Sequence, residues 1–221
     1  MIYRGETDRM EIALDTDEKV VWITQKWKCN FWDINRKNKK WTEVEKTHFK
    51  RRIRALIQDI WSDKAYVAVY SQSGTKFNVT YGGTIFPVKI NIEFVGGGEH
   101  WTINIGKVDD INQDQSFICW ERREAYISNF SLRKCHYDEL VGMDNPGASF
   151  WSAAHEFGHM LGNSSALSPD MGDEYPTAHR FHGDLCSIMN NGSEIRRRHF
   201  RHIKDLLQTM IPGTCFTIGQ G

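Results

Sequence analysis

The clearest periodicity in the chain is helical and lies between residues 42 and 61. Apolar side chains recur there at spacings of three to five, with arginine and lysine between them, as on a helix that buries one face. Thr42 and Glu45 have the spacing of a capping box, and Ser62-Asp63 would close the helix. We therefore predict an amphipathic helix over 42–61. Its apolar positions are Val44, Phe49, Ile53, Leu56, Ile57 and Ile60.

Alternation of apolar and polar residues replaces this pattern further along the chain. It is clearest over 88–94 and 101–105, where one face of an extended chain would be apolar and the other polar. The predicted strands are 66–70, 77–81, 85–95, 100–108, 117–120 and 125–130. The first 45 residues have no clear period, and we expect their aromatic residues to anchor loops or short strands. These residues are Trp22, Trp27, Phe31, Trp32 and Trp41.

A second helix is predicted from about Pro146 to Leu161. Proline favours the first turn of a helix, and a glycine such as Gly162 favours the position just past the end. A third helix near the C-terminus contains Leu206, Leu207 and Met210.

Together the elements predict an α+β fold in which a mixed twisted sheet packs on the first and second helices. No repeat or linker interrupts the 221 residues, so we expect one domain over 1–221. Its sheet lobe would span about 1–145 and its helical part about 146–221.

The charge balance limits the partners of the protein. The 28 Lys+Arg residues equal the 28 Asp+Glu residues, which argues against nucleic acid as the main partner. Two basic runs, over 50–54 and 196–204, are interpreted as polar helix faces. Residues of the second run would be solvated or pair with the acidic loop at 170–174, while Phe200, Ile203 and Leu207 pack inward.

The chain contains no apolar run long enough for a membrane span and begins without the apolar stretch of a signal peptide. Its five cysteines are odd in number and scattered, which fits neither a disulfide scaffold nor a zinc finger. Their disulfide state is left open. They are Cys29, Cys119, Cys135, Cys186 and Cys215.

The candidate chemistry lies inside the second helix, where residues 155–159 read His-Glu-Phe-Gly-His. Residues four apart share one face of a helix, so His155 and His159 can bind one Zn²⁺ at about 2.0–2.1 Å. Glu156 lies about 100° around the helix from His155, where it can act as general base on a zinc-bound water. Gly158 leaves room beside the metal. The alternative is two histidines that are simply hydrogen-bonded in a core helix.

Residues 155–162 resemble the zinc-binding sequence of metzincin-type metallopeptidases, in which a glycine ends the helix and a third ligand follows three residues later. Ser165 stands at that place, and neutral serine is a poor zinc ligand, so the third ligand must come from elsewhere. Residues 187–189, Ser-Ile-Met, resemble the Met-turn of that family. The resemblance makes Met189 the apolar floor beneath the metal-binding histidines.

The order of motifs over about 146–205 is similar to zinc peptidase domains attached to bacterial type VI secretion spike proteins. The Asp-Glu-Tyr element at 173–175 also resembles the immunoglobulin-A peptidase group. These resemblances imply a metzincin-like fold and a toxin or effector that a specialised bacterial secretion system delivers into a target cell. A secretion-spike protein and an immunity protein would be its partners.

The third zinc ligand is predicted to be Glu174, because a carboxylate on a loop after the helix would complete two histidines and one glutamate. Asp173 is the alternative. Tyr175 has two interpretations: a hydrogen-bond donor to the developing oxyanion, or an aromatic side chain packed next to Pro176. Further ligand candidates are Asp170, His179, His182, Asp184 and Glu194.

These residues predict a zinc metallopeptidase with one zinc per chain. Glu156 would take a proton from the zinc-bound water and deliver it to the leaving amine, while the peptide lies extended along a sheet edge. Two alternatives stay open. One is a zinc amidase acting on cell-wall peptides, and the other is a metal-binding interaction module with a degenerate, inactive site.

Overall fold

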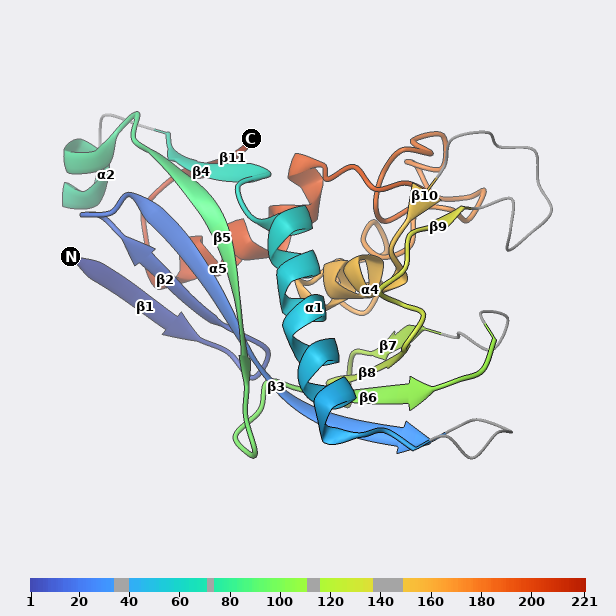
Figure 1. Cartoon of the computed structure of the whole chain (residues 1–221). Helices are drawn as coiled ribbons and strands as arrows, with labels where there is room; N and C mark the ends of the chain where they lie inside the picture. The colour runs from blue at the N-terminus through green and yellow to red at the C-terminus, as the bar shows by residue number, and fades with distance from the viewer. Residues whose placement is uncertain (34–39, 71–73, 111–115, 137–148) are drawn as a thin grey trace.

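The computed structural model describes residues 1–33, 40–70, 74–110, 116–136 and 149–221 (Figure 1). Within these residues the fold is α+β, with four α-helices and a mixed twisted sheet, as predicted. The helices are α1 (Glu43–Trp61), α2 (Lys76–Tyr81), α4 (Ser152–Met160) and α5 (Arg201–Met210), the last preceded by a 3₁₀ helix, η2 (Arg197–Phe200). The strands are β1 (Ile2–Glu6), β2 (Glu11–Asp15), β3 (Val20–Asp33), β4 (Ala65–Val69), β5 (Ile85–Phe94), β6 (Trp101–Lys107), β7 (Phe117–Cys119), β8 (Glu124–Ser128), β9 (Cys135–His136), β10 (Ser149–Phe150) and β11 (Phe216–Gln220).

The strands of the main sheet follow the order β11-β4-β5-β3-β6-β8-β7, and β2 and β1 extend it beside β3. Strand β3 runs parallel to β5 and β6, and β6 runs parallel to β8. Strand β7 ends the order and pairs antiparallel with β8, with Phe117 opposite Tyr126. One edge of the sheet is therefore formed by β7.

Strand β3 is long and central, although the sequence predicted only loops or short strands before residue 45. Val21, Ile23, Gln25 and Trp27 alternate with less buried residues, so the strand has the expected period. The polar Gln25 hides that period in the sequence. Its side chain is fully buried, donates to the carbonyl of Met160 at 3.0 Å and accepts from the indole of Trp27 at 3.0 Å.

Helix α1 matches its prediction closely. Thr42 and Glu45 form the capping box, and Ser62 is the C-cap. The helix packs against β5 and α4, and in Figure 1 α4 runs across it. At the end of α1, the fully buried Trp61 donates its indole N–H to the carbonyl of Ala154 at 3.0 Å and contacts Phe157 edge to face. Trp61 therefore fixes α4 against the first helix.

Two predicted elements differ from the structure. Residues 76–81 form a helix instead of a strand, because Thr75 caps it and Phe77 and Tyr81, four residues apart, stack on one face. Helix α4 begins at Ser152 and not near Pro146, which lies outside the described residues. Residues 149–150 instead pair with β9.

The C-terminal segment returns to the N-terminal half of the chain. Strand β11 pairs antiparallel with β4, and α5 packs against β1 and β11. Phe200, Ile203 and Leu207 are buried, as predicted. Among the described residues, no helix combines the length and apolar character needed to cross a membrane.

We expect Trp61→Ala to lower the free energy of unfolding by about 3–5 kcal/mol, because it removes a fully buried indole and leaves a cavity between α1 and α4. Denaturant unfolding followed by circular dichroism measures the change. Trp32→Ala is the matched control, since 56% of Trp32 is exposed, and it should cost far less. Equal effects of the two substitutions would contradict the role of Trp61.

Candidate metal centre

Helix α4 holds two histidines one turn apart, and its end determines how the second one is oriented. Gly162 follows the helix with φ 108°, a left-handed conformation that turns the chain back. The carbonyl oxygen of Asn163 then lies 2.5 Å from Nδ1 of His159. The side chain of Asn163 donates to the carbonyls of Gly158 and His199, which fixes this turn.

His155 is oriented by the turn at residues 187–190. Its Nδ1 lies 2.6 Å from the carbonyl oxygen of Ile188. A carbonyl oxygen only accepts hydrogen bonds, so the Nδ1 atoms of both histidines carry the proton. In a neutral ring, Nε2 is then the atom with the lone pair. This backbone support is the arrangement usually found behind metal-binding histidines.

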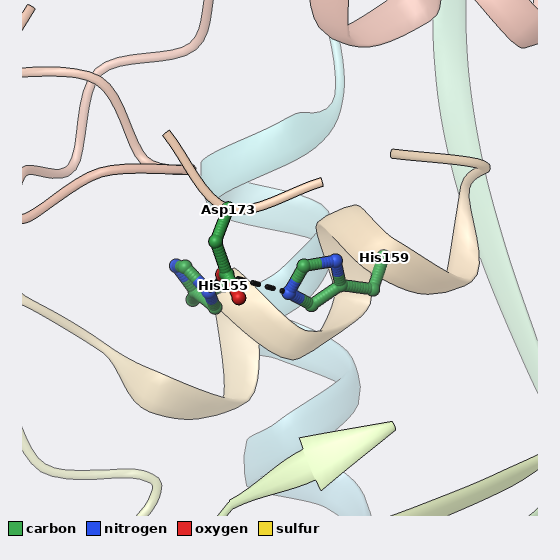
Figure 2. Close-up of side chains that lie close together, drawn as sticks. All are labelled: His155, His159 and Asp173. Carbon is green, nitrogen blue, oxygen red and sulfur yellow. Dashed lines mark hydrogen bonds and ion pairs between the residues drawn. The ribbon is translucent and has the colours of Figure 1, made fainter. Parts of the chain in front are cut away.

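Asp173 completes a cluster with the two histidines (Figure 2). Its Oδ1 lies 3.0 Å from Nε2 of His155 and 3.2 Å from Nε2 of His159. The three ligand atoms all lie within 4.8 Å of one another. Its other oxygen, Oδ2, accepts a hydrogen bond from the hydroxyl of Tyr175 at 2.9 Å.

The donor set fits a zinc ion. Ligands of a tetrahedral zinc at about 2.0–2.1 Å stand roughly 3.3 Å apart, close to the separations between Oδ1 and the two Nε2 atoms. Two lone pairs and a carboxylate facing one point repel one another unless a cation lies between them. His155, His159 and Asp173 are thus the residues that would hold the metal, and the fourth position would remain for water or substrate.

The pKa values of His159 and Asp173 also favour a positive charge at this position. Burial lowers the pKa of His159, but its hydrogen bond to Asp173 and the charge of Glu156 raise that pKa above its ordinary value. Burial raises the pKa of Asp173, yet hydrogen bonds from both histidines hold it well below its usual range. A positive charge between these groups therefore stabilises the cluster, and a divalent metal carries twice the charge of a proton.

Glu174, predicted as the third ligand, does not join the histidines. Its carboxylate is buried and accepts two hydrogen bonds from Arg198, each of 2.7 Å. Burial alone would raise its pKa, but Arg198, His199 and Ser187 hold the pKa of Glu174 at about 2. These contacts turn the carboxylate of Glu174 away from the histidines, whereas that of Asp173 faces them. The candidate ligand is therefore the alternative, Asp173.

Met189 lies beneath the middle of α4. It is fully buried, and a methyl group added to Gly158 would stand 2.4 Å from its Sδ and 3.0 Å from Trp61. The space that Gly158 provides is thus occupied by Met189 and Trp61. The role of Met189 as a floor under bound metal stays a prediction of the Met-turn resemblance.

A pocket of about 250 Å³ opens at the metal-binding atoms. Glu156, which is 7% exposed, lines it together with both histidines and Asp173. Tyr175 also lines it, with 47% of its surface exposed. Ser116, Phe117, Ile118 and Trp120, on and beside edge strand β7, also line the pocket.

The remaining ligand candidates are engaged elsewhere. Asp170 pairs with Arg180, Asp184 with Arg196 and Arg198, and Glu194 with Arg196. His182 donates from Nδ1 to the carbonyl of Tyr175, and Nδ1 of His179 accepts from the N–H of Phe181. Ser165 lines the pocket.

Sequence reasoning missed the supports of the site. Asn163 orients His159 through its carbonyl and fixes the helix end through its amide, and the carbonyl of Ile188 orients His155. A Gly-Asn pair directly after the helix was the available signal for Asn163. No side-chain pattern marks a backbone carbonyl such as that of Ile188.

Comparison of the chain with protein-family models, with curated proteins and with solved structures finds no significant match.

We expect Gly158→Ala to destabilise the protein by about 1–3 kcal/mol, because the methyl group meets Met189 and Trp61. Alanine at a mid-helix glycine would otherwise contribute up to about 1 kcal/mol of stability, so the sign of the effect is informative. Thermal unfolding measures it. The control is Gly96→Ala, whose methyl group meets no described atom within 4 Å. A more stable Gly158→Ala variant would refute this packing.

Proposed function

We propose that the protein is a zinc-dependent hydrolase that cleaves peptide bonds. The main support is the convergence of His155, His159 and Asp173 on one point, with the carboxylate of Glu156 lining the same pocket. When bound, zinc supplies Lewis acidity, which lowers the pKa of water to about 7 and polarises a carbonyl group. The three ligands hold that charge, while the residues around them handle protons and substrate.

Glu156 is the general base in this proposal. It is adjacent to His155 on α4, lines the same pocket and is not one of the three clustered ligands, which suits a base better than a ligand. It takes a proton from the attacking water and passes it to the nitrogen of the departing amine. A base is needed for hydrolysis and not for metal binding, so Glu156 favours an enzyme over a metal-binding interaction module.

Tyr175 has a position that suits transition-state stabilisation. Its hydroxyl donates to Oδ2 of Asp173 and lies in the same pocket. Rotation of this exposed side chain would redirect the hydroxyl from Asp173 to the oxygen that gains negative charge during attack. In its present contact, the hydroxyl also orients the carboxylate of Asp173.

The substrate would lie along β7. The outer side of this strand has no strand partner among the described residues, and β7 lines the same pocket as Glu156. An extended peptide adds to such an edge through main-chain hydrogen bonds, which would carry its carbonyl past the metal ligands. Phe117, 47% exposed on this edge, offers an apolar surface for a substrate side chain.

The same chemistry would serve a zinc amidase acting on cell-wall peptides, and the identity of the substrate separates the two enzymes. The presence of Asp173 beside both histidines weighs against a degenerate site, since a carboxylate can serve as the third ligand in place of a third histidine. Delivery as a bacterial effector stays a prediction from the motif resemblance.

We expect about one zinc per chain in protein purified without a metal-affinity tag. His155→Ala and Asp173→Ala should each lose nearly all of it, because each removes a ligand, and mass spectrometry of metal content measures the loss. The controls are His48→Ala, on the exposed side of α1, and Asp170→Ala, whose side chain is 53% exposed. Zinc-free unaltered protein after zinc supplementation would refute the metal site.

We expect Glu156→Gln to keep its zinc and lose hydrolysis by about 10²–10⁴-fold, because the amide cannot accept the proton. Denatured casein and a quenched fluorescent peptide library, assayed with zinc-loaded protein, measure the rate. Glu18→Gln on the exposed turn after β2 is the control and should keep full activity. If Glu156→Gln cleaves within tenfold of the unaltered protein, Glu156 is not the base.

A further inference from the structure

A chain of alternating charges leads from the surface to the loop that holds Asp173. Arg196 bonds Glu194 at 2.6 Å and both oxygens of Asp184 at 2.8 Å. Arg198 bonds Asp184 at 2.6 Å and both oxygens of Glu174 at 2.7 Å. The exposure of these side chains falls from 60% at Glu194 to 4% at Glu174.

Arg198 is held in one orientation by several contacts. Three hydrogen bonds use its Nε and one terminal nitrogen, and its guanidinium plane lies 4.0 Å from the centre of the Phe181 ring. A planar, forked cation of this kind fixes the direction of a carboxylate, which a lysine ammonium does not. The orientation of the Glu174 carboxylate is therefore set by η2, the element that contains Arg198.

Glu174 is fastened at its backbone as well. Its N–H donates to the carbonyl of Met189 at 2.7 Å, and its own carbonyl accepts from the side chain of Asn190 at 3.4 Å. Nε2 of His199 faces its carboxylate at 3.5 Å. These contacts attach Glu174 to the 187–190 turn and to η2. Asp173 directly precedes Glu174 in the chain, so its backbone is positioned by the same contacts.

The ligand itself has few other supports. Apart from the two histidines, the side chain of Asp173 contacts the exposed Tyr175. The segment 173–174 belongs to a loop without regular secondary structure, so its position depends on such fastenings. A carboxylate misplaced by even a fraction of an ångström binds zinc less well.

We propose that Arg198 is a positioning residue for the metal ligand Asp173, acting through its two-pronged ion pair with Glu174. This inference rests on the proposed zinc-dependent function. Removal of the ion pair would free the 173–174 segment, so zinc binding should weaken about 10- to 100-fold, as for other groups that support a metal ligand. Arg198 touches neither zinc nor substrate in this arrangement.

The experiment measures the Zn²⁺ dissociation constant by chelator competition for the unaltered chain, Arg198→Lys, Glu174→Gln and Asp184→Asn. The visible spectrum of the Co²⁺-loaded proteins reports the ligand geometry, and circular dichroism of the metal-free proteins reports folding. Arg197→Lys is the matched control, since Arg197 is exposed and adjacent in the chain. Asp184 is the most exposed of the three substituted residues. If Arg198→Lys or Glu174→Gln does not fold, Asp184→Asn still tests the positioning role.

We expect the folded Arg198 and Glu174 variants to bind zinc 10- to 100-fold more weakly, with an altered Co²⁺ spectrum. Asp184→Asn should shift both readouts in the same direction by a smaller factor, and Arg197→Lys should shift neither. Folded variants with zinc affinities within threefold of the unaltered chain would overturn the positioning role and leave the proposed function intact. An unaltered chain that binds no zinc would overturn both.

Discussion

Two hydrogen bonds from imidazole to backbone determine what this site can do. Nδ1 of His155 donates to the carbonyl of Ile188, and Nδ1 of His159 donates to the carbonyl of Asn163. Each bond fixes a proton on Nδ1, so in the neutral ring Nε2, which faces Asp173, is the atom with the lone pair. The turn after α4 supplies the carbonyl of Asn163, and the 187–190 turn supplies that of Ile188. Both turns are held in place by the packing of α4 against Trp61, Met189 and Gln25.

The two neighbouring carboxylates after the helix divide the electrostatic tasks. Asp173 faces the histidines, where its negative charge attracts a cation, and Glu174 faces the interior, where Arg198 neutralises it. A buried carboxylate without a partner is costly, so Glu174 and Arg198 depend on each other. The same pairing stiffens the loop whose other carboxylate is the candidate metal ligand. Under the proposed function, local stability and metal binding would be linked through adjacent residues of one short segment.

The sheet contributes both support and access. On its central strand β3, Gln25 donates a hydrogen bond to the carbonyl of Met160 at the end of α4. Carbonyls at a helix terminus need such partners from outside the helix. The sheet's edge strand β7 lines the pocket that also contains Glu156. An edge strand is open to pairing with another extended chain, which would suit the binding of an extended peptide beside the proposed site. The pocket combines this open edge with the carboxylate of Glu156 and three convergent candidate ligands, and this combination is why we propose peptide hydrolysis.

The sequence by itself determined the elements whose signals are local. The capping box and apolar period of 42–61 specify α1, and the four-residue spacing of His155 and His159 places both rings on one helix face. Tertiary structure decided what depends on distant partners. The polar Gln25 interrupts the apolar alternation of β3, so the strand was not predicted. Gln25 can be buried because it donates a hydrogen bond to Met160, which lies 135 residues away. The choice between Asp173 and Glu174 was equally hidden, since either carboxylate can bind zinc. Arg198 and the carbonyl of Met189, both supplied by later parts of the chain, turn Glu174 inward and leave Asp173 to face the metal position.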